Sequence, residues 1–276
     1  MYDPKGEVIG SNTIIIDMTE IYNTQKDLEA HQEIIRQQLI EIKEIDIQKD
    51  EFVSMVAHEL KTPLTAMLMH CDILKITDVP ERLTPSQMED VDSIYRNGEQ
   101  LAKEIGSLLD IQKLKMEKMK FNIEEFRVDG FLVDIFNDFL FITDKKRIKL
   151  MNSTKDKITV KNDRCRLGQV FNNLINNAIS FVPQGTGRIE IGVKKDGNDI
   201  IFYVIDNGSG IPQEKQKDIF KKFYQVDASA SRTHMGTGLG LSICKGIMDG
   251  LGGKIWFESK ENKGTSFYFS VQRGSE

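Results

Sequence analysis

One long stretch without proline or glycine limits the folds that are open to this chain. From Asn23 to Lys49 neither residue occurs, and apolar side chains return every seven positions. The repeat comprises Ile21, Leu28, Ile35, Ile42 and Val56, with Lys49 as its interruption. A period of 3.5 residues sustained this long predicts a coiled coil that continues into the following helix. A solitary helix is the alternative, but its isoleucine stripe would then be exposed to water.

The following helix carries a histidine on its polar face. Apolar residues recur there at three- and four-residue steps, which predicts an amphipathic helix with a buried stripe. The stripe comprises Phe52, Val53, Val56, Leu60, Leu64 and Met67. His58 belongs to the other face, where a neutral imidazole is a competent nucleophile near neutral pH. Glu59 follows it, and Thr62 lies one turn further along the same face. Pro63 removes one helical hydrogen bond and predicts a kink just after the histidine.

A second long helix follows a short polar loop. Turn and N-cap chemistry is present in the segments Thr77–Pro80 and Leu83–Ser86. The apolar positions of the second helix are Met88, Val91, Ile94, Leu101, Ile105, Leu108, Ile111 and Leu114. Two amphipathic helices joined by a short loop form an antiparallel hairpin, which rarely closes a core alone. We therefore expect a homodimer in which two hairpins form a four-helix bundle.

After Met119 the pattern changes to short strands and shorter helices. The strands are expected at residues 121–123, 125–128, 158–161, 188–194, 199–206, 254–258 and 265–271, and the helices at 131–145, 167–181 and 239–251. The strands at 188–194 and 199–206 form a hairpin across Asp196–Asn198. Mixed strands and helices that end in a hairpin predict a two-layer α/β sandwich.

Asparagines are concentrated in the helix expected at 167–181. The run Asn172-Asn173-Leu174-Ile175-Asn176-Asn177-Ala178 allows two pairs at a spacing of four residues. These are Asn172 with Asn176, or Asn173 with Asn177, and the spacing does not choose between them. Amide oxygens are hard ligands that suit Mg²⁺, which prefers oxygen donors together with phosphates and retained waters.

The chain has two glycine-rich segments. The first follows a predicted strand, and the second precedes a predicted helix. The strand at 199–206 ends in Asp206, and Gly208 and Gly210 come next. Glycines let the backbone approach a flat ligand, and a carboxylate accepts from an exocyclic amine. The second segment, Gly236-Thr237-Gly238-Leu239-Gly240, opens a helix whose backbone amides suit phosphate oxygens. It lacks the Gly-Lys-Ser/Thr of a P-loop, and no strand precedes it as a Rossmann fingerprint requires.

Net charge, cysteine spacing and hydropathy limit the classes of partner and the cellular compartment that we expect. A net charge of −5 gives no electrostatic reason to expect nucleic acid or an anionic membrane as partner. Cys71, Cys165 and Cys244 have no metal-ligand spacing, and they are expected to be buried thiols in a reducing compartment. There is no apolar run of about 18 residues and no signal peptide, so no membrane contact is expected within this chain. These features predict a cytoplasmic location, and an upstream membrane segment of a longer parent protein stays compatible with them.

The histidine helix resembles the phosphoacceptor box of the dimeric sensor histidine kinases. His58 through Leu64 read His-Glu-Leu-Lys-Thr-Pro-Leu and match that pattern without a departure. The asparagine run resembles the N box of the superfamily of gyrases, heat-shock chaperones, mismatch-repair ATPases and histidine kinases. The register of that box selects Asn173 and Asn177, with Asn177 as the metal ligand. The family commonly has a lysine where this chain has Ser180, which removes one cationic phosphate contact.

The same resemblance implies roles for the glycine-rich segments. Asp206, with Gly208 and Gly210, resembles the element that reads the adenine amine. The second glycine box supplies Gly236, Gly238 and Gly240, and the last one supplies Thr265 after Gly264. Between them, Ile211–Met235 resembles the ATP lid of the kinases. In this lid Arg232 is a candidate for the γ-phosphate, Lys222 is a weaker one, and Phe220 and Phe223 are placed as in the family.

The resemblance implies a kinase with ATP and Mg²⁺ as cofactors. His58 takes the γ-phosphoryl group, Glu59 accepts or binds the imidazole proton, and the phosphoryl group passes to an aspartate of a response regulator. One alternative is a phosphatase-dominant core, because Glu59-x-x-Thr62 resembles a motif that orients water on the phosphorylated regulator. Another is a scaffold that only docks the regulator, which Ser180 supports and the intact nucleotide boxes argue against.

The expected organisation has four parts in 276 residues. Residues 1–22 are expected to be the remnant of a PAS-like sensor domain, because Asp17-Met18-Thr19-Glu20 resembles the end of such a domain. A coiled-coil signalling helix follows at 23–50, and the dimerisation and histidine phosphotransfer domain at 51–120. Residues 121–276 are expected to form the catalytic ATP-binding domain. The fold class is thus a helical hairpin in a dimeric four-helix bundle, followed by an α/β two-layer sandwich.

Overall fold

A computed structural model of the chain describes residues 4–7, 19–76, 83–155, 157–225 and 237–272. The chain divides into two units, residues 1–53 and 54–276. The two strands expected between residues 7 and 17 fall almost entirely outside the described residues, and so does the PAS-like phrase at Asp17-Met18. The expected turn near the N-terminus is present at residues 4–6.

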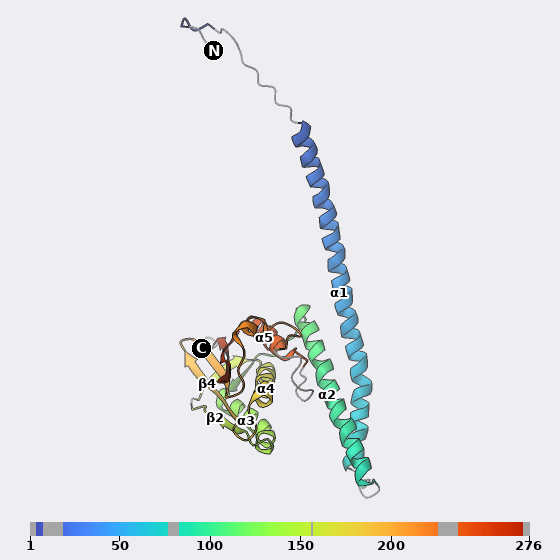
Figure 1. The fold of residues 1–276 in the computed structure, drawn as a ribbon, viewed down its shortest axis with the longest axis vertical. Coiled ribbons are helices and arrows are strands. Elements are labelled where there is room, and N and C mark those ends of the chain that lie inside the picture. Colours follow the sequence, from blue (N-terminus) through green and yellow to red (C-terminus); the bar gives the residue numbers. More distant parts are fainter. Residues whose placement is uncertain (1–3, 8–18, 77–82, 156, 226–236, 273–276) are drawn as a thin grey trace. The chain divides into compact units, whose positions relative to one another are not determined.

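Helix α1 covers Thr19–Ile76 and confirms the long helix expected from the absence of proline and glycine (Figure 1). In the part of α1 that belongs to the first unit, large apolar side chains of the seven-residue repeat are exposed in the single chain. They include Leu28, Ile35 and Ile42, with Leu39 and Ile45 beside them. A stripe of this kind is stable in water only when another apolar surface covers it.

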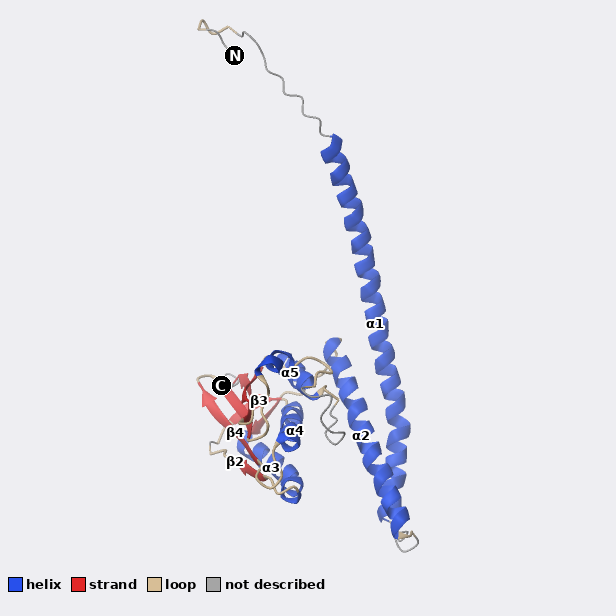
Figure 2. Cartoon of the chain, viewed as in Figure 1, coloured by secondary structure: helices blue, strands red, loops and turns tan. Residues whose placement is uncertain are grey.

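In the second unit, the rest of α1 forms an antiparallel hairpin with α2, which covers Pro85–Lys115 (Figure 2). The hairpin core is formed by buried Ala57, Leu64 and Ile105. Near the loop, the ammonium of Lys75 lies 3.0 Å from the Asp92 carboxylate, which fixes how the two helices are paired. The predicted hairpin is therefore confirmed.

In the single chain, the stripe predicted on the histidine helix is only partly buried. Leu64 is buried, but Leu60 is 52% exposed and Met67 is 60% exposed, and Phe52 is exposed as well. The buried apolar positions in this part of α1 are Ala57, Leu64 and Cys71, spaced by seven residues, and Ala57 and Leu64 pack with Ile105 of α2. The helix thus has two apolar seams, and only one of them meets α2 of the same chain.

Helix α2 begins with the capping chemistry that its sequence predicts. The Thr84 hydroxyl accepts from the Gln87 amide at 3.3 Å, and the Gln87 side chain accepts from the Thr84 amide at 2.9 Å. Pro85 occupies the first turn, where its missing N–H has no helical partner to lose. Together these residues fix the start of the helix.

The C-terminal part is an α/β domain with one mixed sheet. Its helices are α3 (Val128–Lys145), α4 (Arg164–Phe181) and α5 (Gly240–Gly250), with a short 3-10 helix, η2, at Gln213–Asp218. The sheet strands are β2 (Lys149–Asn152), β4 (Arg188–Asp196), β5 (Asp199–Asp206), β6 (Lys254–Lys260) and β7 (Gly264–Gln272). Their order is β2-β4-β5-β7-β6, parallel between β2 and β4 and antiparallel elsewhere. A separate antiparallel pair joins β1 (Glu124–Arg127) to β3 (Thr159–Asn162). The predicted sandwich is confirmed.

Two expectations for this domain fail for local reasons. Residues 121–123 are not a strand, because the Asn122 amide donates to the Asp163 carboxylate at 2.7 Å and Phe121 packs against Gly250. Strand β2 was not predicted at all, because Lys149–Asn152 has only four residues and little alternation. Its pairing with β4 is a long-range contact that no local pattern reveals.

The core of the domain lies between the helices and one face of the sheet. Phe171 of α4 is fully buried at its centre. Its ring centroid lies 5.8 Å from that of Phe131, 5.7 Å from Phe202 and 4.9 Å from Phe269. A single aromatic side chain thus joins α3, α4, β5 and β7, and edge-to-face rings of this kind add to the burial of apolar area.

Replacing Phe171 with alanine should lower the free energy of unfolding of this domain by about 3–5 kcal/mol, because it removes buried ring area and leaves a cavity. Urea denaturation followed by circular dichroism measures the change. Phe141→Ala is the matched control, because the Phe141 ring on α3 is 79% exposed. A control as destabilised as the Phe171 variant would contradict this account of the core.

Candidate functional site

The polar face of α1 around His58 presents three side chains to solvent. His58, Glu59 and Thr62 are all exposed. The Thr62 hydroxyl donates to the main-chain carbonyl of His58 at 3.4 Å, so the two residues lie one turn apart as predicted. Pro63 lies inside the helix, which continues to Ile76. An exposed imidazole on a rigid helix is open to attack an electrophile held by another part of the protein.

Helix α4 positions the asparagines. The Asn173 amide donates to the Gly240 carbonyl at 3.5 Å, which joins α4 to the start of α5. The Asn176 amide instead donates to the Asn172 carbonyl at 2.7 Å, within the helix itself. Asn173 and Asn177 are half-buried and share one face, whereas Asn172 is exposed. Of the two pairs that the spacing allowed, Asn173 with Asn177 is the one directed toward the glycine-rich segment.

Asp206 ends β5 beside the last glycine box. Its Oδ1 atom accepts from the Gly208 amide at 2.8 Å and from the Thr265 amide at 3.2 Å. Burial raises the pKa of Asp206 above its ordinary value of 3.8, and the two backbone donors act in the opposite direction. Among the described residues, no hydrogen-bond donor reaches Oδ2. The carboxylate is therefore fixed in place with one oxygen ready to accept from a ligand.

Two glycines of these segments are needed by the chain itself. Gly210 has a φ of +70°, and a Cβ there would collide with the Lys260 carbonyl. Gly238 has a φ of +69°, and a Cβ would lie 2.7 Å from the main chain of Phe223. The Phe223 amide also donates to the Gly238 carbonyl at 3.0 Å. The contacts at Gly238 bring Phe223, near the middle of the expected lid, against the second glycine box.

The remaining predicted residues fall into three groups. Thr265 is buried beside Asp206, and Gly208 and Gly264 lie against the same residue, whereas Gly240 lies beside Asn173. Lys222 is exposed, near the middle of the expected lid. Arg232 and Gly236 lie outside the described residues. The Ser180 hydroxyl donates to the Asn176 carbonyl at 2.8 Å, so it stabilises α4 and brings no positive charge to this face.

Sequence reasoning missed Ser259 of β6. Its hydroxyl accepts from the Ile211 amide at 2.9 Å and lies 2.9 Å from the Thr265 hydroxyl. The Gln216 amide donates to the Ser259 carbonyl at 3.2 Å. Ser259 thus ties the segment after Gly210 to the last glycine box. A lone serine in a strand carries no local signal of such a role.

The cysteines only partly follow expectation. Cys71 and Cys244 are buried, as predicted, but Cys165 is exposed near the N-terminus of α4. The reason is helical phase, since Leu167 and Val170 turn to the core and leave Cys165 on the solvent side. Burial raises the pKa of Cys244 to about 12, which keeps this thiol protonated beneath Asn173.

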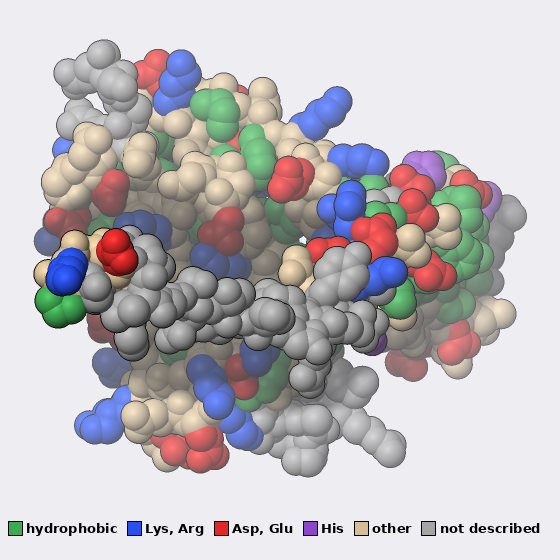
Figure 3. Space-filling view, turned by 90° about the horizontal axis from the view of Figure 1, so that it is seen from above, with side chains coloured by type: hydrophobic (Ala, Val, Ile, Leu, Met, Phe, Trp, Pro, Cys, Tyr) green, Lys and Arg blue, Asp and Glu red, His purple; other side chains and the backbone are tan. Residues whose placement is uncertain are grey.

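Three further observations concern surface charge, hydropathy and metal-ligating side chains. On the face shown in Figure 3, acidic and basic side chains are interspersed and do not form a patch of one sign. No helix in the described part of the chain is long and apolar enough to cross a bilayer. Within the same residues, no group of three or more His, Cys, Asp or Glu side chains could hold a metal ion. A metal at this site would therefore depend on asparagine oxygens together with ligand phosphates and waters.

Family models match both parts of the chain. Residues 48–117 match the His Kinase A (phospho-acceptor) domain. Residues 162–275 match the histidine kinase-, DNA gyrase B- and HSP90-like ATPase. The two matches cover the helical hairpin and most of the α/β domain.

Curated relatives are histidine kinases of greater length. The signal transduction histidine-protein kinase BarA of Escherichia coli K12 is 31% identical over 228 residues, which is 81% of this chain and 24% of BarA. The sensor protein kinase WalK of Staphylococcus aureus MRSA252 is 32% identical over 235 residues, which is 84% of this chain and 38% of WalK. The chain thus spans well under half the length of these relatives.

Solved structures show the same fold. The histidine kinase AdeS of Acinetobacter baumannii has a TM-score of 0.57 at 25% identity, covering 79% of this chain and 98% of the AdeS chain. Full-length ShkA in complex with AMPPNP has a TM-score of 0.68 at 23% identity, covering 82% of this chain and 47% of that one. With the phosphoacceptor helix, the nucleotide-type site and both family matches in agreement, the chain belongs to the histidine kinases of two-component signal transduction.

Proposed function

We propose that this chain is the catalytic core of a dimeric sensor histidine kinase that transfers the γ-phosphoryl group of ATP to His58 and then to an aspartate of a response regulator. The observation that carries the proposal is the exposed His58 in an unbroken phosphoacceptor box, on the same chain as an ATPase-type site built around Asp206. The domain bounds stay as the sequence predicts them, with the phosphotransfer domain at 51–120 and the ATP-binding domain at 121–276.

ATP binding is assigned to α4, the end of β5 and the glycine boxes. The free Oδ2 of Asp206 accepts from the adenine amine, while Thr265 and Gly208 hold the other oxygen. Backbone amides at the beginning of α5, from Gly238 and Gly240, face the phosphates. Lys222 and Arg232 are the cations assigned to the phosphate end of the nucleotide.

The donor set fits a magnesium ion. Asn177 offers a hard amide oxygen on the same face of α4 as Asn173, and Mg²⁺ is typically held by few protein ligands plus phosphates and waters. When bound, the ion neutralises charge on the phosphates in the transition state. Asn173 orients the site through its bond to Gly240.

The chemistry on α1 needs one nucleophile and one proton acceptor. An imidazole nitrogen of His58 forms the new bond to the γ-phosphorus as the bond to the ADP oxygen breaks, and Glu59 accepts or binds the proton of the other nitrogen. Adjacent helical residues do not face one another, so Glu59 reaches the ring by its length. Thr62 lies on the surface that the regulator approaches.

The proposed homodimer follows from apolar side chains that the single chain leaves exposed. Leu60 and Met67 on α1, and Ile94 and Leu101 on α2, all belong to the hairpin and are exposed. Burying large apolar side chains stabilises an assembly by roughly 1.5–3 kcal/mol each. A second hairpin provides the matching surface in a four-helix bundle. The assignment to the cytoplasm is part of the same proposal.

His58→Gln should reduce the acid-labile label from γ-labelled ATP to background, because the variant lacks the nucleophile. Nucleotide affinity should stay within about twofold, since the change is outside the ATP site. The measurement is labelling of the purified chain, followed by acid and alkali treatment. His70→Gln, at an exposed position of the same helix, should keep the label. Persistent acid-labile label in the His58 variant would refute the assignment.

Asp206→Asn should weaken nucleotide binding by about tenfold or more, because a charged acceptor is lost.

The same substitution should make the folded domain more stable at neutral pH. Since burial raises the pKa of Asp206, ionisation disfavours the folded state, and the wild type loses stability relative to the variant as pH rises from about 4 to the folded pKa. Above that pKa the difference should be constant. Titration with a fluorescent ATP analogue and urea unfolding at several pH values test both parts. A variant that is least stable, relative to wild type, at neutral pH would contradict the account.

Sedimentation of the full chain at micromolar concentration should give a dimer. Leu101→Lys should shift it toward monomer, because a buried unpaired ammonium is costly in an apolar seam. Phe141→Lys, at an exposed apolar position of the ATP-binding domain, should leave the dimer unchanged. A folded wild-type monomer, or a Leu101 variant as dimeric as the wild type, would count against the bundle.

A further inference from the structure

Three polar side chains stand in a row across β5, β7 and β6. Thr265 of β7 lies directly opposite Asp206 of β5, and Ser259 of β6 lies directly opposite Thr265. Side chains at directly opposed positions point to the same face of a sheet, with Cβ atoms about 4.5–5.5 Å apart. This is the core face, because Phe267 and Phe257, two positions along β7 and β6, belong to the hydrophobic core. The row therefore forms the polar end of that face.

The Ser259 hydroxyl is the centre of the hydrogen bonds in this row. It accepts from the Ile211 amide at 2.9 Å and donates to the Gly264 carbonyl at 3.2 Å. It also lies 2.9 Å from the Thr265 hydroxyl, where either oxygen can be the donor. A serine hydroxyl has one proton to donate and two lone pairs that accept. All three contacts are hydrogen bonds together only if that proton goes to the carbonyl, which cannot donate, and Thr265 donates to Ser259.

This bonding pattern leaves the Thr265 hydroxyl without a proton for any other group. Its proton is directed at Ser259, so Thr265 Oγ1 can only accept from a ligand. The next side chain in the row is Asp206, whose Oδ1 accepts from the Thr265 amide at 3.2 Å and whose Oδ2 is assigned to the adenine amine. The site therefore presents two acceptors side by side, and Ser259 sets the polarity of one of them.

Main-chain contacts hold the groups around the Ser259 hydroxyl in place. The Gln216 amide donates to the Ile211 carbonyl at 2.9 Å and to the Ser259 carbonyl at 3.2 Å. A Cβ at Gly210 would collide with the Lys260 carbonyl, so the chain before Ile211 runs directly against β6. The Ile211 amide is thus fixed in front of Ser259 and occupies one lone pair of its hydroxyl. The direction of the remaining protons follows from the fold.

Two adjacent acceptors discriminate between purines, whereas one acceptor does not. A single carboxylate oxygen accepts from the 6-amino group of adenine and equally from the N1–H of a 6-oxo purine such as hypoxanthine. An acceptor-only hydroxyl beside it suits the two N–H groups of a 6-amino group. The same hydroxyl meets a 6-oxo oxygen lone pair to lone pair, which leaves a buried acceptor unpaired. The polarity of Thr265 therefore decides which purine the site prefers.

We propose that Ser259 is a positioning residue that determines base specificity: by holding the Thr265 hydroxyl as an acceptor, it makes the site bind 6-amino purine nucleotides in preference to 6-oxo ones. This inference rests on the proposed ATP site at Asp206 and names what that site discriminates against. Ser259 acts through Thr265. The inference does not depend on the reaction at His58, so nucleotide binding alone tests it.

Competition of ATP and of ITP against a fluorescent ATP analogue, in the full chain, tests the proposal. ITP carries hypoxanthine on the same ribose triphosphate. The wild type should bind ATP about tenfold or more tightly than ITP, as for one unpaired buried acceptor. Ser259→Ala frees the Thr265 proton, so the ratio of the two affinities should fall about fivefold or more toward one. Thr265→Val should lower the ratio likewise, since it removes the hydroxyl and keeps the main-chain amide that holds Asp206.

Three further variants separate this role from general damage to the site. Ser259→Thr keeps a hydroxyl at a strand position, which a β-branched residue suits, and should keep the wild-type ratio. Ser266→Ala changes the neighbouring position of β7 on the opposite face of the sheet, and should leave both affinities within about twofold. In the Thr265→Val background, Ser259→Ala should not change the ratio further, because the group through which Ser259 acts is already absent.

An equal loss of ATP and ITP affinity in Ser259→Ala, with the ratio unchanged, would show that Ser259 only supports the fold. A wild type that binds ATP and ITP equally would overturn the inference, and so would an effect of Ser259→Ala that persists in Thr265→Val. If circular dichroism shows that Ser259→Ala does not fold, a wild-type ratio in Thr265→Val overturns the inference instead.

Failure of the proposed function looks different. A wild type that does not bind the fluorescent analogue would refute the proposed ATP site, and the inference with it. A wild type that binds ATP but carries no label on His58 would refute the kinase function alone. The ratio of ATP to ITP affinity would still decide in that case what Ser259 does.

Discussion

The two-sided character of α4 is the constraint on which the ATP-binding domain depends. On one side, Phe171 fills the centre of the core and contacts rings from α3, β5 and β7. On the other side the helix is polar and carries Arg166 and Asn173. Because the core contacts fix the rotation of the helix, they also fix the direction of every polar side chain along it. Packing thus determines where the polar side chains assigned to the nucleotide lie.

Asp206 lowers the folding stability of the domain, because its charged carboxylate is partly buried at the site. Its carboxylate is partly buried, and burial disfavours the charged form. Two backbone amides, of Gly208 and Thr265, offset part of that penalty and hold the side chain still. Both reach the same oxygen, so the compensation leaves the other oxygen for a ligand. A fully satisfied carboxylate would be more stable and could not read an amine.

Local pattern was enough to predict the long helices and the sandwich, and it failed where tertiary contacts decide. The heptads predicted α1, and the capping residues at Thr84 predicted the beginning of α2. The hydrophobic stripe could not reveal which seam meets α2 in the same chain, so the exposure of Leu60 in the single chain was not predicted. Strand β2 depends on parallel pairing with β4, which lies far along the chain. The asparagine register needed the family resemblance, because Asn172 and Asn173 have equivalent spacing.

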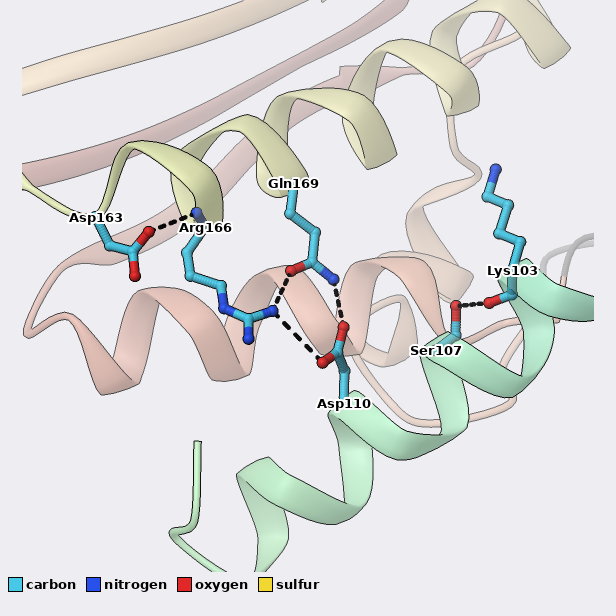
Figure 4. A network of polar contacts seen from close by, with 6 residues as sticks. All are labelled: Lys103, Ser107, Asp110, Asp163, Arg166 and Gln169. Carbon is cyan, nitrogen blue, oxygen red and sulfur yellow. Dashed lines mark hydrogen bonds and ion pairs between the residues drawn. The ribbon is translucent and has the colours of Figure 1, made fainter. Parts of the chain in front are cut away.

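The polar network between α2 and α4, formed by Asp110, Arg166 and Gln169 (Figure 4), could not be predicted from sequence for a related reason. Asp110, Arg166 and Gln169 are ordinary polar residues on helix surfaces, and nothing in their spacing links α2 to α4. Their effect comes from placement, since they join the helix beside His58 to the helix assigned to ATP. A single surface ion pair contributes little, but a shielded, closed network beside packed Leu114 and Gly246 adds to an existing apolar contact.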